Sequence, residues 1–294
     1  MIARLRLPVL LTTVAIVAMA CAETEPPTPL FTGELSAGNP VQEVEEAEAV
    51  AVAPEPREPS ATESEQLDAA LEDTPQGCNV LDTSSCLLPF PSDFNSVEDP
   101  DSPTGRRVAF PKGQLPNTDG VTFDPTVWNT LDGFSPSTPI LVTVPRLDTK
   151  STVLPSEDNI GVSLTPESAT VLINLDSGQL VPHWAELDSR ATDSARRSLI
   201  IRPAVSLTEA NRFAVALRGV NAAGGKPIDA PIAFKAIRDN ITTDSAEIED
   251  LRADYQPVFD ALALHGGEPQ RRVPRLVVHG GLTPEPRGER AVHA

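Results

Sequence analysis

Two short apolar runs separated by a polar segment stand at residues 198–217, SLIIRPAVSLTEANRFAVAL. The runs, Ser198–Arg202 and Arg212–Leu217, are rich in β-branched and other apolar residues, a composition typical of β-strands. Pro203 and the polar residues after it favour a turn or loop between the two runs. This stretch therefore predicts two strands of a β-sheet.

Further apolar runs of the same kind surround this stretch, at spacings of roughly 10 to 25 residues. They lie at Ile140–Val144, Gly161–Leu164, Thr170–Leu175 and Val181–Asp188. Because no long helices alternate with them, the pattern favours an antiparallel β-sandwich over an α/β domain. We expect a mainly β fold over residues 77–243, in which residues 86–139, dense in Pro, Asp and Gly, form long ordered loops with short extended pieces.

One helix is expected, C-terminal to the strands, at residues 244–265. Asp244 can cap its first turn, with Glu247 three residues later as the capping-box partner. Apolar residues then recur at helical spacing, and Pro257 should kink or divide the helix. The recurring residues are Ile248, Leu251, Tyr255, Val258 and Leu262.

The N-terminal 20 residues have the layout of an export signal. Arg4 and Arg6 precede an apolar run that ends in small residues, and this run is too short to be a good membrane span. The stretch Val17–Cys21 resembles a lipobox, although Ala18 stands where that motif usually has Leu, Val or Ile. The resemblance implies that residues 1–20 are removed and that Cys21 is acylated and binds membrane lipid. Ordinary secretion with Cys21 left as a free thiol is the alternative.

Residues 21–76 are predicted to be an acidic, Pro-rich, disordered linker between anchor and domain. Residues 22–75 contain 14 acidic side chains and one basic side chain, Arg57, which gives this segment a net charge of −13. Like charge and few large apolar residues leave too little burial to offset the entropy of ordering. A ligand for a partner or for the cell wall is the less favoured interpretation.

Cys78 and Cys86 remain as a pair once Cys21 is assigned to lipid. An exported chain meets an oxidising compartment, so we expect these two residues to form a disulfide that closes a small loop. Metal binding is the alternative, but no second pair of Cys or His stands nearby.

The sequence assigns no catalytic residues and no cofactor. The Gly-x-Ser-x-Gly pentapeptide of α/β-hydrolases does not occur, so His265-Gly266-Gly267 and His279-Gly280-Gly281 have no nucleophile to serve. In the run 181–188, strand geometry puts His183 on the face opposite Glu186 and Asp188, which favours a half-buried strand over a catalytic group. The formal net charge of −19 argues against nucleic acid as a partner.

Three aspartates in turn-rich sequence, Asp99, Asp101 and Asp119, could offer oxygen ligands to calcium. Their spacing matches no complete loop motif, and Asp before Pro or Gly also serves turns. No metal site is therefore assigned.

Several stretches resemble known families. Leu199–Pro203, Arg212–Leu217 and Gly224–Ile228 are similar to strands and a loop of bacterial Ig-like domains. Leu88–Asp93 and Asp132–Ser135 resemble the N-terminal domain of bacterial virulence-factor lipases, which are secreted or surface-anchored esterases. The resemblance covers about residues 77–262 and implies an Ig-like β-domain that precedes a serine hydrolase domain.

The segment 266–294 departs from the rest: it is rich in Arg, Gly and His and lacks periodicity. We expect an irregular tail, and our hypothesis is that this tail is read out of frame in a truncated product. The leading hypothesis is an exported, lipid-anchored, non-catalytic β-domain of a lipase- or esterase-like hydrolase, at the outer membrane or cell surface if the source is Gram-negative. The alternative is a stand-alone binding module for a polymer or protein partner, which an exposed patch of Phe90, Phe94, Trp128 and Phe134 would favour.

Overall fold

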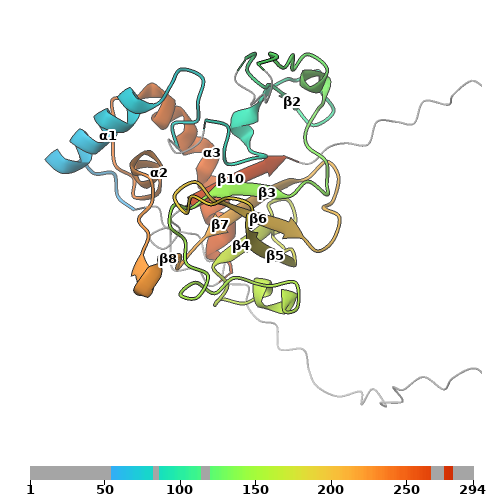
Figure 1. The fold of residues 1–294 in the computed structure, drawn as a ribbon. Helices are drawn as coiled ribbons and strands as arrows, with labels where there is room; N and C mark the ends of the chain where they lie inside the picture. The colour runs from blue at the N-terminus through green and yellow to red at the C-terminus, as the bar shows by residue number, and fades with distance from the viewer. Residues whose placement is uncertain (1–53, 82–85, 114–119, 266–274, 281–294) are drawn as a thin grey trace, which may run out of the picture. The chain divides into compact units, whose positions relative to one another are not determined.

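The computed structural model describes residues 54–81, 86–113 and 120–265 and the backbone of residues 275–280. The predicted signal peptide 1–20, Cys21 and most of the predicted linker lie outside these residues. The described strands pair antiparallel in four small sheets, so the fold is mainly β, as predicted (Figure 1).

Two of these sheets have three strands each. One has the order β10 (Arg275–Gly280), β7 (Arg212–Leu217), β4 (Thr170–Asn174), and we call it the middle sheet. The other, the outer sheet, has the order β3 (Ile140–Thr143), β6 (Ser198–Pro203), β5 (His183–Leu187). The predicted strands at 140–144, 170–175, 181–188, 198–202 and 212–217 are thus confirmed.

The remaining elements are short. Two-stranded ribbons are formed by β1 (Ser96–Glu98) with β2 (Arg106–Val108) and by β8 (Asn221–Ala222) with β9 (Lys226–Pro227). Single 3₁₀ turns are η1 (Asp93–Asn95), η2 (Trp128–Thr130), η3 (Ile160–Leu164) and η4 (Ala223–Gly225). Residues 86–139 are therefore loops with short extended pieces, as the Pro, Asp and Gly content predicted.

The two larger sheets share one apolar core. Strand side chains that point between the sheets come from β4 and β7 on one side and from β3, β5 and β6 on the other. This inter-sheet core comprises Ile140, Val142, Val144, Leu147, Ala169, Leu172, Val181, Ala185, Leu199, Ile201, Leu207, Phe213, Val215, Leu217 and Val220. The outer sheet therefore covers one face of the middle sheet.

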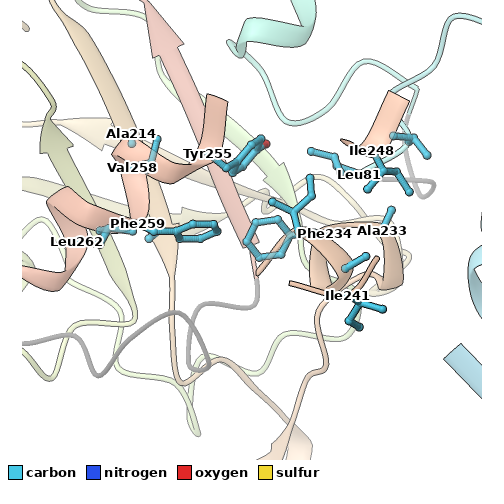
Figure 2. Packing of buried hydrophobic residues seen from close by; sticks show 14 of the residues in the cluster. Leu81, Ala214, Ala233, Phe234, Ile241, Ile248, Tyr255, Val258, Phe259 and Leu262 are labelled. Carbon is cyan, nitrogen blue, oxygen red and sulfur yellow. The ribbon is translucent and has the colours of Figure 1, made fainter. Parts of the chain in front are cut away.

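Helices cover the other face of the middle sheet (Figures 1 and 2). They are α2 (Ile232–Arg238) and α3 (Ala246–Ala263), and α1 (Ala61–Asp73) packs against α2. Their helix-side core comprises Leu67, Val80, Leu81, Val171, Ile173, Ala214, Ala216, Ala233, Phe234, Ala236, Ile237, Ile241, Ile248, Tyr255, Val258, Phe259 and Leu262. Phe234 of α2 meets the rings of Tyr255 and Phe259 of α3 at centroid distances of 5.9 and 6.4 Å.

The expectation of a single helix was wrong, because only α3 was predicted. It begins after Ser245, whose side chain accepts a hydrogen bond from the Ile248 amide, rather than after Asp244, and it continues through Pro257. Arg252 of α3 donates to the backbone carbonyls of Ala236 and Ile241 at 3.1 and 2.8 Å. This guanidinium satisfies carbonyl groups at the end of α2 and ties the two helices together.

The predicted disordered linker 21–76 is wrong over its last part, where α1 forms. Ser60 and Glu63 make a capping box, and Leu67 is buried in the helix-side core. Ahead of the helix, the Arg57 amide donates to the Asn240 carbonyl at 3.0 Å, and the Arg57 carbonyl accepts from the Thr242 amide at 2.9 Å. Local acidity did not prevent folding here, because Glu63 pairs with Arg57 in the same segment and with Lys235 of α2, and Leu67 joins an apolar core supplied by distant parts of the chain.

Two smaller expectations also need correction. Residues 161–164, predicted as a strand, belong to the 3₁₀ turn η3, where the Ser163 hydroxyl donates to the Ile160 carbonyl at 2.7 Å. The predicted irregular tail 266–294 contains β10, which pairs antiparallel with β7.

Candidate functional site

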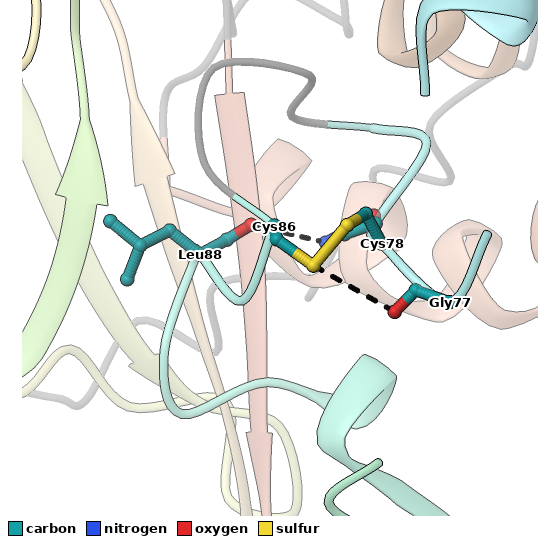
Figure 3. Close-up of a disulfide and its surroundings, with 5 residues drawn as sticks. Gly77, Cys78, Cys86 and Leu88 are labelled. Carbon is teal, nitrogen blue, oxygen red and sulfur yellow. Dashed lines mark hydrogen bonds between the residues drawn. A yellow bond between two sulfur atoms is a disulfide. The ribbon is translucent and has the colours of Figure 1, made fainter. Parts of the chain in front are cut away.

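The predicted disulfide is present between Cys78 and Cys86, with an S–S distance of 2.11 Å (Figure 3). The Asn79 amide donates to the Cys86 carbonyl at 3.1 Å, and the Asn79 side-chain oxygen accepts from the Leu81 amide at 3.0 Å. Val80 and Leu81 follow directly and are buried in the helix-side core. The disulfide therefore constrains the segment that contains Val80 and Leu81, whose side chains pack in the helix-side core.

His183 has the geometry of a base beside a hydroxyl, but it lies in the interior. Its Nε2 is 2.8 Å from Thr170 Oγ1, and its Nδ1 is 2.9 Å from the Val181 carbonyl. Burial lowers the pKa of this imidazole, and the two hydrogen bonds oppose that shift only in part. His183 and Thr170 are both 0% exposed, so no substrate can reach the pair. The predicted structural interpretation of this strand, with Glu186 on the opposite, exposed face, agrees with this arrangement.

The sequence analysis gave no catalytic role to the other two histidines that precede Gly-Gly, His265 and His279. His265 Nε2 contacts the Gly178 carbonyl at 2.5 Å, a bond that ties the end of α3 to a turn of the middle sheet. The side chain of His279 in β10 lies outside the residues described at side-chain level.

The structure describes two of the three aspartates considered for calcium, Asp99 and Asp101. Asp99 forms an ion pair with Arg107, and this hydrogen bond is the main cause of the lowered pKa of its carboxyl. Asp99 also accepts from the Asp101 amide at 3.0 Å, which is a turn contact, while Asp119 lies outside the described residues. Within the described ranges, no group of three or more His, Cys, Asp or Glu side chains is placed to bind a metal ion.

A charged cluster joins the loop region to the middle sheet. Asp93 Oδ2 accepts from Arg212 at 2.7 Å, and its Oδ1 is 3.9 Å from Arg106 Nε. These side chains, with Asp132, line a cavity of about 50 Å³. The two arginines and two aspartates balance in charge, and the cavity is too small for a ligand of ordinary size. The cluster therefore serves to connect the loop region to strand β7 through the Asp93–Arg212 ion pair.

A second charged cluster forms where α1 begins, around Glu63. Its carboxylate accepts from Arg57 at 2.8 Å and from Lys235 of α2 at 2.9 Å. The Arg57 hydrogen bond is the largest of several contacts that hold the pKa of Glu63 well below its usual range. Grooves of about 1010 and 510 Å³ flank α1 on its two sides, so the helix is attached along a narrow seam through Leu67 and Glu63.

The four aromatic residues proposed as a surface patch separate into two groups. Phe90 and Phe134 pack against Phe110, with ring centroids 6.1 Å or less from Phe90, and Phe134 is buried. Phe94 is half-buried. Trp128 is 44% exposed and contacts Phe123 at a centroid distance of 4.5 Å. Trp128 is therefore the most exposed of the four, and Phe134 is the buried one.

Trp128 belongs to a loop that exposes several aliphatic side chains. Val121 and Val127 are 71% and 70% exposed, and Leu131 is 42% exposed. We call residues 121–131 the apolar loop. The sequence analysis identified Trp128 but missed the three aliphatic residues. The signal that could have found them is their position among turn residues: without strand or helix periodicity, their side chains are not directed toward a core.

Hydrogen bonds connect the C-terminal end of the apolar loop to residues 107–110. The Asn129 side chain both accepts from the Phe110 amide at 2.8 Å and donates to the Phe110 carbonyl at 3.0 Å. The Val108 amide donates to the Leu131 carbonyl at 2.9 Å, and Arg107 donates to the Thr130 carbonyl at 2.6 Å. These bonds fix the backbone at the C-terminal end of the loop, next to Trp128, which lowers the entropy that this part loses on binding.

Comparison of the chain with models of protein families, with curated proteins and with solved structures found no significant match. In the residues that the structure describes, no helix combines the length and apolar character needed to cross a membrane.

Proposed function

We propose that this chain is an exported lipoprotein, anchored through acylated Cys21, whose Ig-like β-domain is the non-catalytic N-terminal module of a lipase- or esterase-like hydrolase. The observation that carries the export part is the Cys78–Cys86 disulfide. Structural disulfides persist in oxidising compartments and are rare in the cytosol. The disulfide and the predicted N-terminal export signal therefore both support a location outside the cytoplasm.

The hydrolase part rests on the sequence resemblance at Leu88–Asp93, Asp132–Ser135 and residues 199–228. In this proposal the β-domain supports or positions a hydrolase domain, and the serine chemistry belongs to that domain. The hydrolase would be found by resequencing the gene across codons 260–300 and translating the DNA beyond them in all forward frames. A frame that continues into Gly-x-Ser-x-Gly, followed by Asp and His, is the expected result, and its absence would remove the hydrolase from the proposal.

Mass spectrometry of the mature N-terminus tests the anchor. The chain is expressed in a bacterial host, and its N-terminal peptide should begin at Cys21 and carry acyl chains. Cys21→Ser is the matched control, because it removes the thiol that is acylated, and its N-terminal peptide should carry no acyl chain. An unmodified Cys21, or cleavage at another residue, contradicts the anchoring proposal.

A second candidate is a stand-alone binding module for a surface polymer or protein, and the apolar loop is the observation that favours it. Co-sedimentation of the purified chain with isolated cell-wall polymer tests this function. Trp128→Ala should weaken such binding, whereas the N-terminal module of a hydrolase would show no dependence on Trp128 in this assay.

A further inference from the structure

The apolar loop gathers exposed apolar surface in a way that no other described loop does. Nine large apolar side chains are exposed in the described residues, and four of them, Val121, Val127, Trp128 and Leu131, lie within this one segment. The other five are scattered over the chain at Val97, Val153, Leu164, Val205 and Leu264. Single exposed apolar residues are ordinary, whereas a group on one loop marks a contact surface.

We propose that the apolar loop docks on the surface of a zwitterionic lipid bilayer. This inference deepens the proposed function and rests on it, since a chain acylated at Cys21 stays near a membrane. From Cys21 to the first described residue, Pro54, the chain can span at most about 110 Å. The domain is therefore confined within this distance of the bilayer, which makes the lipid surface the partner that the apolar loop meets most often.

The side chains of the loop suit a membrane interface. Tryptophan is enriched at the boundary between headgroups and acyl chains, where its ring is apolar and its N–H can stay hydrated. Val121, Val127 and Leu131 add aliphatic surface next to it. Acyl chains on Cys21 hold the N-terminus at the bilayer. The apolar loop would attach the folded domain itself to the same surface.

Charge sets the depth of insertion and the choice of lipid. Asp124 lies within the loop, and its carboxylate accepts from the Thr126 amide at 3.1 Å and from the Thr126 hydroxyl at 2.6 Å. These bonds hold the Asp124 carboxylate in its charged form, which restricts the loop to the headgroup region. Because the chain carries a formal net charge of −19, an anionic bilayer repels it and a zwitterionic one does not.

The test uses the exported chain, starting at residue 21, with Cys21→Ser to remove acylation and Trp184→Phe to leave Trp128 as the one remaining tryptophan of two. Phosphatidylcholine vesicles should shift the Trp128 emission to shorter wavelength, and brominated acyl chains should quench it. Vesicles rich in phosphatidylglycerol should bind more weakly at low salt.

Val127→Asp should reduce vesicle partitioning by about tenfold or more. Val205→Asp is the matched control, because Val205 is also an exposed valine, 52% accessible, on a different loop, and it should change partitioning by less than about twofold. Equal effects of the two variants, or Trp128 emission that vesicles leave unchanged, would overturn the proposal. So would an emission shift that follows the addition of lipid-free envelope protein but not of vesicles.

Because the tested chain has no acyl group, its result does not depend on the fate of Cys21 in cells. Failure of vesicle binding with an acylated native N-terminus would reject the apolar loop as a docking surface and leave the anchor intact. Vesicle binding with an unmodified Cys21 would support the apolar loop as a docking surface and reject the anchor.

Discussion

The middle and outer sheets bury their strands in different ways. All five residues of β4 are buried, as are five of the six in β7, whereas the outer strands β5 and β6 alternate between buried and less buried positions. The reason is that the middle sheet is covered on both faces, by the outer sheet and by the helices. A strand buried on both faces loses the polar alternation of a half-exposed strand. A continuous apolar run such as Thr170–Leu175 is thus a sign of a third layer.

Adjacent residues on β4 belong to different cores. Leu172 points into the inter-sheet core and Ile173 into the helix-side core, and both are 0% exposed. On β6 the corresponding neighbours differ, since Ile201 is 0% exposed and Ile200 is half-buried on the outward face. Substitutions in these two pairs, Leu172 with Ile173 and Ile201 with Ile200, therefore measure how much each covering layer contributes to the free energy of unfolding.

The largest effects are expected from truncating these buried side chains. Leu172→Ala, Ile173→Ala and Ile201→Ala should each lower the free energy of unfolding by about 2–5 kcal/mol, because each leaves a cavity in a packed core. Ile200→Ala should cost about 1 kcal/mol or less. Urea unfolding followed by circular dichroism gives the four values.

The comparison on β4 is the critical one. If Ile173→Ala costs no more than Ile200→Ala, the helices do not pack tightly on the middle sheet, and the three-layer description fails. Leu172→Ala is the control for the strand itself, since it removes a side chain of equal size one position away.

The fold was predictable from sequence to the extent that its contacts are local. The β-branched and apolar content of Ser198–Arg202 and the turn residues after it identify a strand, and the spacing of Ile248 to Leu262 identifies α3. Helix α1 was missed although its capping box, Ser60 with Glu63, is a local signal. Only part of its charge neutralisation is remote, since Glu63 pairs with Arg57 six residues away and with Lys235 172 residues away. A sequence of local acidic residues cannot reveal that the charge is neutralised by a distant helix.

The disulfide belongs to the helix-side layer, so its loss should affect that layer first. Replacing Cys78 and Cys86 together by Ala opens a loop of sequence separation 8, which should cost about 2.5 kcal/mol by loop-closure entropy. The measurement is the urea midpoint of the double variant against the oxidised parent. The parent under reducing conditions should match the variant, and an unchanged midpoint in both would show that the bridge contributes nothing to the attachment of Val80 and Leu81.

The Glu63 cluster should give a smaller and pH-dependent effect. Glu63→Gln should cost about 1–2 kcal/mol, since it weakens charge-assisted hydrogen bonds that are only partly shielded from water. In the folded chain the pKa of Glu63 is lowered, so its contribution is complete above the ordinary glutamate pKa of about 4.3 and is lost as the pH falls below that value.

Hydrogen exchange of the α1 amides between pH 3 and pH 6, corrected for intrinsic rates, measures this effect. The parent should lose protection of α1 on acidification, whereas Glu63→Gln should be weakly protected throughout. Glu65→Gln, an exposed position on the same helix, is the control and should behave like the parent. Loss of protection with equal pH dependence in Glu63→Gln would assign the attachment of α1 to Leu67 alone.

The candidate site was less predictable than the fold. Trp128 was recognisable as an aromatic residue in turn-rich sequence, but Phe90 and Phe134, which occur in sequence of the same character, are packed against Phe110. Exposure of an apolar side chain in a loop depends on what the rest of the chain leaves uncovered, and no periodicity encodes that. The reciprocal bonds of Asn129 with Phe110, which fix the apolar loop, likewise join residues 19 apart.

The smallest effect is expected on the outward face of the outer sheet, where Glu186 of β5 and Arg202 of β6 form an ion pair at 2.9 Å. Their side chains are 51% and 38% exposed, so water and salt screen the attraction. Glu186→Ala and Arg202→Ala should each change the free energy of unfolding by less than about 0.5 kcal/mol, and a double-mutant cycle in urea should give a coupling of the same size. A coupling above about 1.5 kcal/mol would mean that this face is shielded from solvent, as a covering domain or a second chain would shield it, because only desolvation strengthens a pair of this geometry to that degree. Repeating the cycle at 1 M salt separates the cases, since a screened surface pair loses its coupling there and a covered pair retains it.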